Sequence, residues 1–394
     1  MKRMLGERES MNISGKIGLS TLHIKNYGSI LQCYATKTFL EKEGYECILL
    51  DLKENRKIFS LNTLKKFIRL AYDSIVYRQY LKNWFYMKKS MKKDSANVQP
   101  KTLENMNVFV NKYLEPRDYT WNQLKKLSKN PEYIAFITGS DQVWNLSRKL
   151  NPLFFLEFCS REKRIAFSVS CGVYCVPNFN IKSFAKKLKL FDRISVREES
   201  IIKPIEELSG IHAIRLADPT LLLSKEEWLE LLGKKCKYEN YIFVHFLNEP
   251  SQLAIDCINQ HNTEGLKVIC LGYYYTVLNK IKNIDYVDGG PGDYITLINS
   301  AKRVYTDSFH TTLFSINFNK IFYCFERQYS HQYPQTSRIM DLLNRFNLKN
   351  RFITDLNSNC SQIDYLKINH ILKKETKNIQ MYLKDELNKR KNGN

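Results

Sequence analysis

Short apolar runs alternate with longer segments of helical spacing along most of the chain. The apolar runs of the first half, at 16–22, 46–52, 133–139, 164–170, 193–196 and 213–218, are typical of buried strands. Between the first two runs, Leu31, Ala35 and Phe39 recur at the i, i+4 and i+8 positions of one helix face, and Gly44 suits the residue that follows a helix end. A strand, a helix and a strand in this order predict a βαβ unit and a parallel sheet.

The same rhythm starts again after residues 224–240, a charged segment without a strand pattern that we interpret as an interdomain connection. Strands are expected at 241–246, 267–271, 303–306 and 321–325, with helices at 250–262, 292–301 and from about 310. The pattern therefore predicts two α/β domains, one over 11–232 and one over 241–350. Residues 361–394 are expected to form a C-terminal helix and a basic tail.

Residues 53–93 depart from this rhythm. They contain twelve Lys or Arg and two acidic residues, so they supply 12 − 2 = +10 of the chain's net charge of +21. We expect one or two basic amphipathic helices here, within a helical insertion in the first domain over about 53–130. Basic residues interleaved with aromatic ones suit an anionic lipid surface or single-stranded nucleic acid, and a merely solvated lysine-rich helix pair is the third interpretation.

The ten cysteines are scattered singly and form no CxxC pair. This usage favours free thiols in a reducing compartment over a disulfide framework, and no metal site is predicted. The N-terminal segment lacks the apolar core of a secretory signal, and no apolar stretch approaches the ~18–20 residues that span a bilayer. A cytoplasmic protein is therefore expected, with peripheral contact at the inner face of the cell membrane as an extension of that expectation.

Four polar clusters follow predicted strands, where strand ends and helix N-termini of a parallel sheet meet. They are Asn26-Tyr27-Gly28-Ser29, Gly139-Ser140-Asp141-Gln142, Ser195-Val196-Arg197-Glu198 and Thr306-Asp307-Ser308-Phe309-His310. Gly28 permits a close backbone approach, Arg197 can bind phosphate or carboxylate through two hydrogen bonds, and His310 can donate a proton near neutral pH. The structural alternatives are an N-cap at Ser29, an ordinary turn at 139–145, an ion pair of Arg197 with a neighbouring glutamate and a packed histidine.

Four strings resemble the polysaccharide pyruvyl transferase family: NYGSILQ at 26–32, GSDQVWN at 139–145, LADPTLLL at 216–223 and YTDSFHTTLFSINFNK at 305–320. They stand in the family's order and cover most of the chain. The resemblance implies two Rossmann-like domains that face a cleft, as in glycosyltransferase-B enzymes. It also implies transfer of a pyruvyl group from phosphoenolpyruvate to a sugar of a cell-surface polysaccharide or its lipid-linked precursor, which forms a pyruvate ketal without a cofactor.

The matched motifs also imply roles for single residues. His310 would be the proton donor and Arg197 a ligand of phosphoenolpyruvate. The other residues implied to bind substrate are Asn26, Gly28, Ser29, Ser140, Asp141, Asp307 and Ser308. A downstream arginine should hold the donor, and we favour Arg338 over Arg327 because the resemblance extends through its helix. Thr311 stands where the family usually has Gly, so its side chain is expected to narrow the pocket.

The implied chemistry suits these residue types. Protonation of the methylene carbon of phosphoenolpyruvate needs a general acid, which typically contributes about 10²–10⁴-fold to a rate. The charged donor needs cations, and the acceptor would be a sugar or a lipid-linked oligosaccharide. The main rival is a glycosyltransferase that uses a nucleotide sugar on the same scaffold, because a fold does not determine a function. No specific nucleic-acid partner is expected, and the sequence predicts no oligomeric state.

Overall fold

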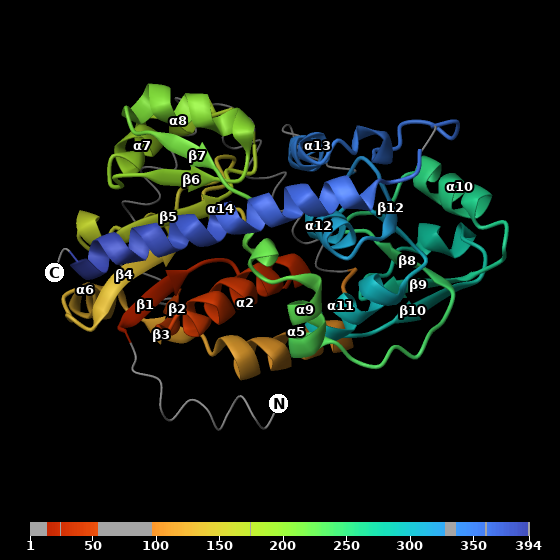
Figure 1. The fold of residues 1–394 in the computed structure, drawn as a ribbon, viewed down its shortest axis with the longest axis horizontal. Coiled ribbons are helices and arrows are strands. Elements are labelled where there is room, and N and C mark those ends of the chain that lie inside the picture. Colours follow the sequence, from red (N-terminus) through yellow and green to blue (C-terminus); the bar gives the residue numbers. More distant parts are fainter. Residues whose placement is uncertain are drawn as a thin grey trace, which may run out of the picture.

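The computed structural model describes residues 14–23, 25–53, 97–173, 175–327, 336–358 and 361–392. Within these residues the strands form two parallel sheets, one of seven strands and one of five (Figure 1). The α/β fold with two Rossmann-like domains that the sequence predicts is therefore confirmed. The basic segment 53–93 lies outside the described residues except for Lys53, so its predicted helices and its membrane contact stay predictions.

The first sheet has the strand order β3-β2-β1-β4-β5-β6-β7. Its strands are β1 (Lys16–Ser20), β2 (Glu46–Leu52), β3 (Arg117–Tyr119), β4 (Tyr133–Thr138), β5 (Arg164–Val169), β6 (Ile194–Val196) and β7 (Ala213–Arg215). Its helices are α2 (Tyr27–Lys42), α5 (Pro100–Phe109), α6 (Trp121–Leu127), α7 (Asn178–Leu188) and α8 (Ile202–Ser209). The chain leaves β1 in one direction for β2 and returns on its other side as β4. The direction of the connections therefore reverses between the neighbouring strands β1 and β4. This is the topological switch point of the sheet, and ligands of such sheets bind at its carboxyl edge.

The second sheet has the order β10-β9-β8-β11-β12, with its switch point between β8 and β11. Its strands are β8 (Tyr241–His245), β9 (Lys267–Leu271), β10 (Ile284–Val287), β11 (Arg303–Thr306) and β12 (Ile321–Cys324). The helices of this half are α9 (Lys225–Leu232), α10 (Gln252–His261), α11 (Pro291–Ser300), α12 (Phe309–Asn317) and α13 (Thr336–Arg345). Short helical turns lie at Val110–Leu114, Pro152–Phe155, Arg161–Lys163, Glu199–Ile201, Pro219–Leu222, Thr276–Lys280 and Lys349–Arg351.

The long helix α14 (Tyr365–Asn392) runs from the second domain back across the first (Figure 1). Its Tyr382 hydroxyl donates a hydrogen bond of 3.0 Å to the Ala166 carbonyl of β5. Ile379, Leu383 and Leu387 on the same face are buried. The predicted C-terminal helix thus covers a face of the first sheet, and the helix continues through Lys391 and Asn392 into the predicted tail.

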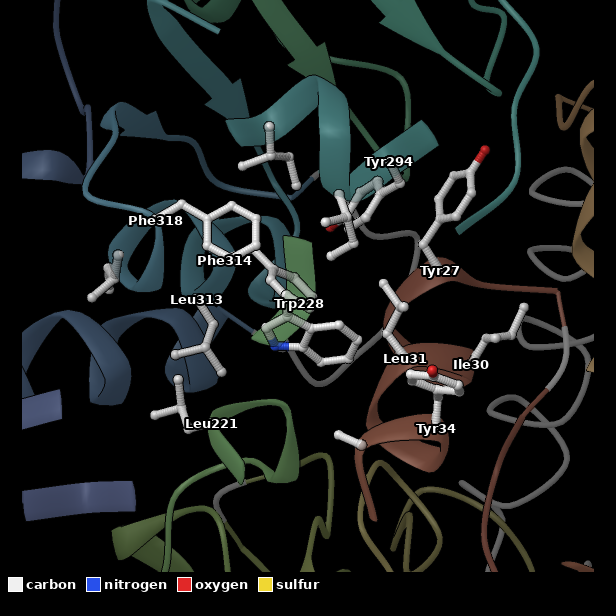
Figure 2. Close-up of a cluster of buried hydrophobic side chains, with 14 of the residues drawn as sticks. Tyr27, Ile30, Leu31, Tyr34, Leu221, Trp228, Tyr294, Leu313, Phe314 and Phe318 are labelled. Atoms are coloured by element: carbon white, nitrogen blue, oxygen red, sulfur yellow. The ribbon is translucent and has the colours of Figure 1, made fainter. Parts of the chain in front are cut away.

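An apolar cluster joins the two domains (Figure 2). Tyr27 of α2 stacks on Tyr294 of α11 at 4.7 Å between ring centroids, and its hydroxyl donates to the Gly289 carbonyl at 2.7 Å. Trp228 of α9 is fully buried and lies 5.3 Å from the ring of Phe314 in α12. The N-terminus of α2 is therefore held against the second domain by packing around the site that it helps to form.

Three elements were not predicted from the sequence. The insertion expected to be helical contains strand β3, which pairs with β2, and β10 was also not predicted. Both strands are short and lie at sheet edges, where little apolar alternation marks them. The connection at 224–240 contains helix α9, which Ser224 and Glu227 begin with a capping box and which Trp228 anchors in the core.

Candidate active site

A cavity of about 190 Å³ lies between the two domains, where both switch points face each other. The loops after β1, β4, β8 and β11 surround it, together with helix α13. The residues that line it are Leu22, Asn26, Ser29, Asp141, Gln142, Asn145, Arg148, Leu247, Asp307, Ser308, Phe309, His310, Arg327, Arg338 and Ile339. The structure thus brings most of the predicted site residues to one place.

The N-terminus of α2 forms one wall of the cavity. Asn26 caps this helix, because its side-chain oxygen accepts hydrogen bonds from the amides of Gly28 at 2.9 Å and Ser29 at 3.3 Å. The cap lies three residues before Ser29, the alternative that the sequence offered, so α2 begins at Tyr27. The Ser29 hydroxyl is left to donate a hydrogen bond to the Asp141 carboxylate. This bond ties the loop after β1 to the loop after β4.

His310 reaches the cavity from the second domain, in the first turn of α12. Ser308 caps this helix by accepting a 3.4 Å hydrogen bond from the Thr311 amide. The His310 ring is buried, and its Nε2 lies 3.5 Å from Oδ2 of Asp218, which follows β7 in the first domain. The opposite side of the ring lies against Gly28, which leaves no room for a β-carbon there. The close approach at Gly28 is thus one between its backbone and the His310 ring, and Gly28 is not among the residues that line the cavity.

Arg197 lies behind the cavity instead of lining it. Its guanidinium donates a hydrogen bond to Asp218 and lies 3.8 Å from Oδ1 of Asp141. It also stacks on the ring of Phe309 at 4.6 Å, and Phe309 is one of the residues that line the cavity. Arg197 and Asp218 are both buried, so the ion pair between them is shielded from water.

The buried carboxylates differ in their protonation. Burial alone would raise the pKa of Asp218, but Arg197 and His310 hold it well below its usual range. Burial acts on Asp141 in the same way, and the charges of His310 and Arg197 again lower its pKa. Both groups are therefore anions. Asp307 differs because burial raises its pKa to about 6, although Arg327 opposes the shift.

Asp307 also organises the cavity wall. Its carboxylate accepts hydrogen bonds from the backbone amides of Leu247 at 2.7 Å and Asn248 at 3.1 Å, and so fixes the loop after β8. Arg327 donates a hydrogen bond to the side chain of Asn248 in that loop. These contacts connect the ends of β8 and β11 across the second switch point.

Three arginine side chains line the cavity: Arg148, Arg327 and Arg338. Arg338 is buried and Arg327 is half-buried, whereas Arg148 is exposed at the rim. Both downstream candidates from the sequence therefore reach the site. Arg148 was not predicted, although it stands three residues after GSDQVWN and belongs to the same polar strand-end region.

The predicted site residue Ser140 and the neighbouring position Thr311 do not line the cavity. Ser140 is fully buried, and its hydroxyl donates to the Ser168 carbonyl at 2.6 Å, so it supports the turn beneath the cavity. The Thr311 hydroxyl lies 2.9 Å from the Tyr294 hydroxyl in the interdomain core. The expectation that Thr311 narrows the pocket is wrong, because its side chain is not among those that line it. Asp218 was missed as a site residue, although LADPTLLL marked its position.

Within the residues that the structure describes, no group of three or more His, Cys, Asp or Glu side chains could hold a metal ion. No helix in the same ranges combines the length and apolar character needed to cross a membrane.

The chain resembles several solved structures at low sequence identity. UDP-GlcNAc 2-epimerase from Neisseria meningitidis is 8% identical with a TM-score of 0.48, over 94% of this chain and 99% of that one. A glycosyltransferase from Rickettsia africae is 10% identical with a TM-score of 0.46, over 95% and 93%. A Thermobaculum terrenum O-GlcNAc transferase mutant is 9% identical with a TM-score of 0.40, and the match covers 93% of this chain and 64% of that one.

No curated protein matches the sequence. The family model of polysaccharide pyruvyl transferase, in contrast, matches residues 26–329. This range contains all four strings that carry the resemblance and every cavity residue except Leu22, Arg338 and Ile339. The chain therefore belongs to the polysaccharide pyruvyl transferase family.

Proposed function

We propose that this protein transfers a pyruvyl group from phosphoenolpyruvate to two hydroxyls of one sugar and releases phosphate. The observation that carries the proposal is the placement of His310 in a cavity that three arginine side chains line. A proton donor beside several cations is what protonation of a highly charged enol phosphate requires. The acceptor proposed is a sugar of a cell-surface polysaccharide or of its lipid-linked precursor, and the chemistry uses no cofactor.

The size of the cavity favours a compact donor. Its volume of about 190 Å³ is below the range of about 300–1,000 Å³ that sites for larger organic ligands span. The positive charge of the cavity also favours an anionic donor, because Arg148, Arg327 and Arg338 can each offer charge-assisted hydrogen bonds to phosphate or carboxylate oxygens. A nucleotide sugar would need room for a base, a ribose and a second sugar. These features support phosphoenolpyruvate over the rival donor.

In the proposed reaction, the His310 imidazolium donates its proton to the methylene carbon of phosphoenolpyruvate, which becomes a methyl group. The cation that forms at C2 is stabilised by the adjacent ester oxygen and is attacked by the first sugar hydroxyl, whose proton returns to His310. The C–O bond to phosphate then breaks, and the second hydroxyl closes the ketal. Its proton leaves with the phosphate, so that atoms and charges balance.

A thermal stability scan separates the two donor classes. Phosphoenolpyruvate at 100 times its Kd should stabilise the fold by about 2.7 kcal/mol, because a ligand that binds only the folded state acts by mass action. UDP-glucose and UDP-N-acetylglucosamine at equal concentration should have little effect. Stabilisation by a nucleotide sugar without any response to phosphoenolpyruvate would overturn the proposal in favour of a glycosyltransferase.

A substitution of the acid tests the chemistry. His310→Gln should keep the response to phosphoenolpyruvate and lose phosphate release by about 10²–10⁴-fold, measured with a panel of sugars that carry free hydroxyl pairs. The surface variant Lys203→Gln, at a side chain that is 86% exposed, is the matched control and should turn over normally. Near-normal turnover by His310→Gln would exclude this residue as the proton donor.

A further inference from the structure

Asp218 has no substrate-binding role in the sequence predictions, yet it connects the two domains at the candidate acid. One of its carboxylate oxygens, Oδ1, accepts a 2.9 Å hydrogen bond from the Thr220 amide and caps the turn Pro219–Leu222. The other, Oδ2, receives the Arg197 guanidinium and lies 3.5 Å from Nε2 of His310. The side chain of Asp218 is 0% exposed. Its position is therefore determined from three directions.

We propose that Asp218 is a positioning residue for His310, and that Arg197 acts on the reaction through Asp218 and does not bind the donor. This inference rests on the proposed function of the same site. Asp218 would keep a proton on Nε2 and hold the ring in one orientation. Nε2 is buried and lies 3.5 Å from the Asp218 carboxylate, so the proposal assigns to Nδ1 the exchange of the proton that the reaction uses.

The surroundings of Arg197 support this division of roles. Its acidic contacts, Asp218 and Asp141, both belong to the first domain, and the Phe309 ring lies against the guanidinium. A carboxylate buried without a cation would be costly, so Arg197 is what allows Asp218 to stay ionised behind the ring. One nitrogen of the guanidinium donates to Asp218, and the side chain is buried outside the residues that line the cavity. Arg338, whose guanidinium lies 5.9 Å from the Phe309 ring, lines the cavity and is placed to meet the donor.

The charges that act on His310 come from every side of the ring. Asp218 and Arg197 lie behind it, and Asp141 lies beside it. The charged side chains that line the cavity in front are Asp141, Arg148, Asp307, Arg327 and Arg338. Removal of the Asp218 charge would therefore take the carboxylate away from Nε2 and leave the cations of the site in place.

The first test compares the effect of each substitution on turnover (kcat) with its effect on the KM for the donor. Asp218→Asn keeps the shape of the side chain and an oxygen for the Thr220 amide, and should lower kcat by about 10²–10⁴-fold with the KM for phosphoenolpyruvate within about twofold. Arg197→Lys should also act on kcat, whereas the comparison variant Arg338→Ala should raise KM. A loss of donor affinity in Arg197→Lys as large as that in Arg338→Ala would overturn the role assigned to Arg197.

The second test does not depend on turnover. Nitrogen NMR of the protein labelled with ¹⁵N-histidine distinguishes the two tautomers of the neutral ring, and the spectrum of His310→Gln identifies the signal of His310. We expect the Nε2-protonated tautomer in the wild-type protein, and a loss of this tautomer preference in Asp218→Asn. If Asp218→Asn does not fold, Asp218→Ser retains an acceptor for the Thr220 amide and serves instead.

The two proposals fail in different ways. An unchanged tautomer in the Asp218 variant would overturn the positioning role, even in a protein that uses phosphoenolpyruvate. A normal NMR result in a protein that shows no response to phosphoenolpyruvate would instead overturn the proposed donor and leave the contact between Asp218 and His310 in place.

Discussion

The imidazole ring of His310 occupies the space that a β-carbon on Gly28 would need. Such a carbon would lie 2.7 Å from the β-carbon of His310 and closer still to the ring itself. Gly28 belongs to the first turn of α2 and His310 to the first turn of α12, so two helix N-termini from different domains meet at this contact. The backbone of Gly28 is helical, and the position requires glycine for space alone.

The contact predicts that Gly28→Ala displaces His310. Phosphate release from phosphoenolpyruvate should fall at least tenfold, and overpacking should lower the free energy of unfolding by about 1–3 kcal/mol. The matched control is Gly290→Ala, where the nearest atoms to an added β-carbon are those of Asn105 at 3.5 Å, an ordinary contact. Equal activity of the two variants in a steady-state assay would show that the ring does not need its observed position.

Alanine substitutions of the cavity arginines should weaken the binding of phosphoenolpyruvate. Arg338→Ala should have the largest effect, since the guanidinium is buried and a charge-assisted hydrogen bond contributes about 1.5–3 kcal/mol, or roughly 10–150-fold in Kd. Arg327→Ala should have a smaller effect, and Arg148→Ala the smallest, because that side chain is exposed. Isothermal titration of each variant with phosphoenolpyruvate measures this order, which a larger effect of Arg148→Ala would contradict.

Thr311→Gly tests whether this position affects the donor site. Its side chain meets Tyr294 in the interdomain core, so the substitution should lower the free energy of unfolding by about 1–3 kcal/mol through the lost hydrogen bond and the glycine in a helix. The KM for phosphoenolpyruvate should not change. Denaturant unfolding and steady-state kinetics measure the two quantities. A changed KM with unchanged stability would show that Thr311 affects the donor site.

Asp307 should make the stability depend on pH in a defined window. Because burial raises its pKa from 3.8 to about 6, the folded protein holds this proton more tightly than the unfolded chain. Its stabilising contribution is therefore full below about pH 4 and is lost as the pH rises through 6, by on the order of 3 kcal/mol. Asp307→Asn should lack this slope. Denaturant unfolding of both proteins between pH 4 and 7 measures it, and parallel curves would contradict the shift.

The prediction of the architecture succeeded where the pattern is local. Apolar runs such as 133–139 and 241–246 became central strands of the two sheets, because strands buried on both faces need continuous apolar side chains. The edge strands β3 and β10 escaped prediction because their few residues pair on one side and carry little apolar pattern. The packing of Trp228 was not predicted either, because a tryptophan in a charged segment does not reveal which domain it packs against.

The sequence by itself determined the two parallel sheets, the polar clusters at their strand ends and the family, because periodicity, capping and motif spacing are properties of neighbouring residues. Only the tertiary structure decided what those clusters do. It placed Arg197 behind Phe309, joined Asp218 to His310 across the domain boundary and turned Thr311 into the core. Burial and charge pairing arise from residues that are distant in the chain, so no local pattern distinguishes an arginine that meets a ligand from one that neutralises a buried carboxylate.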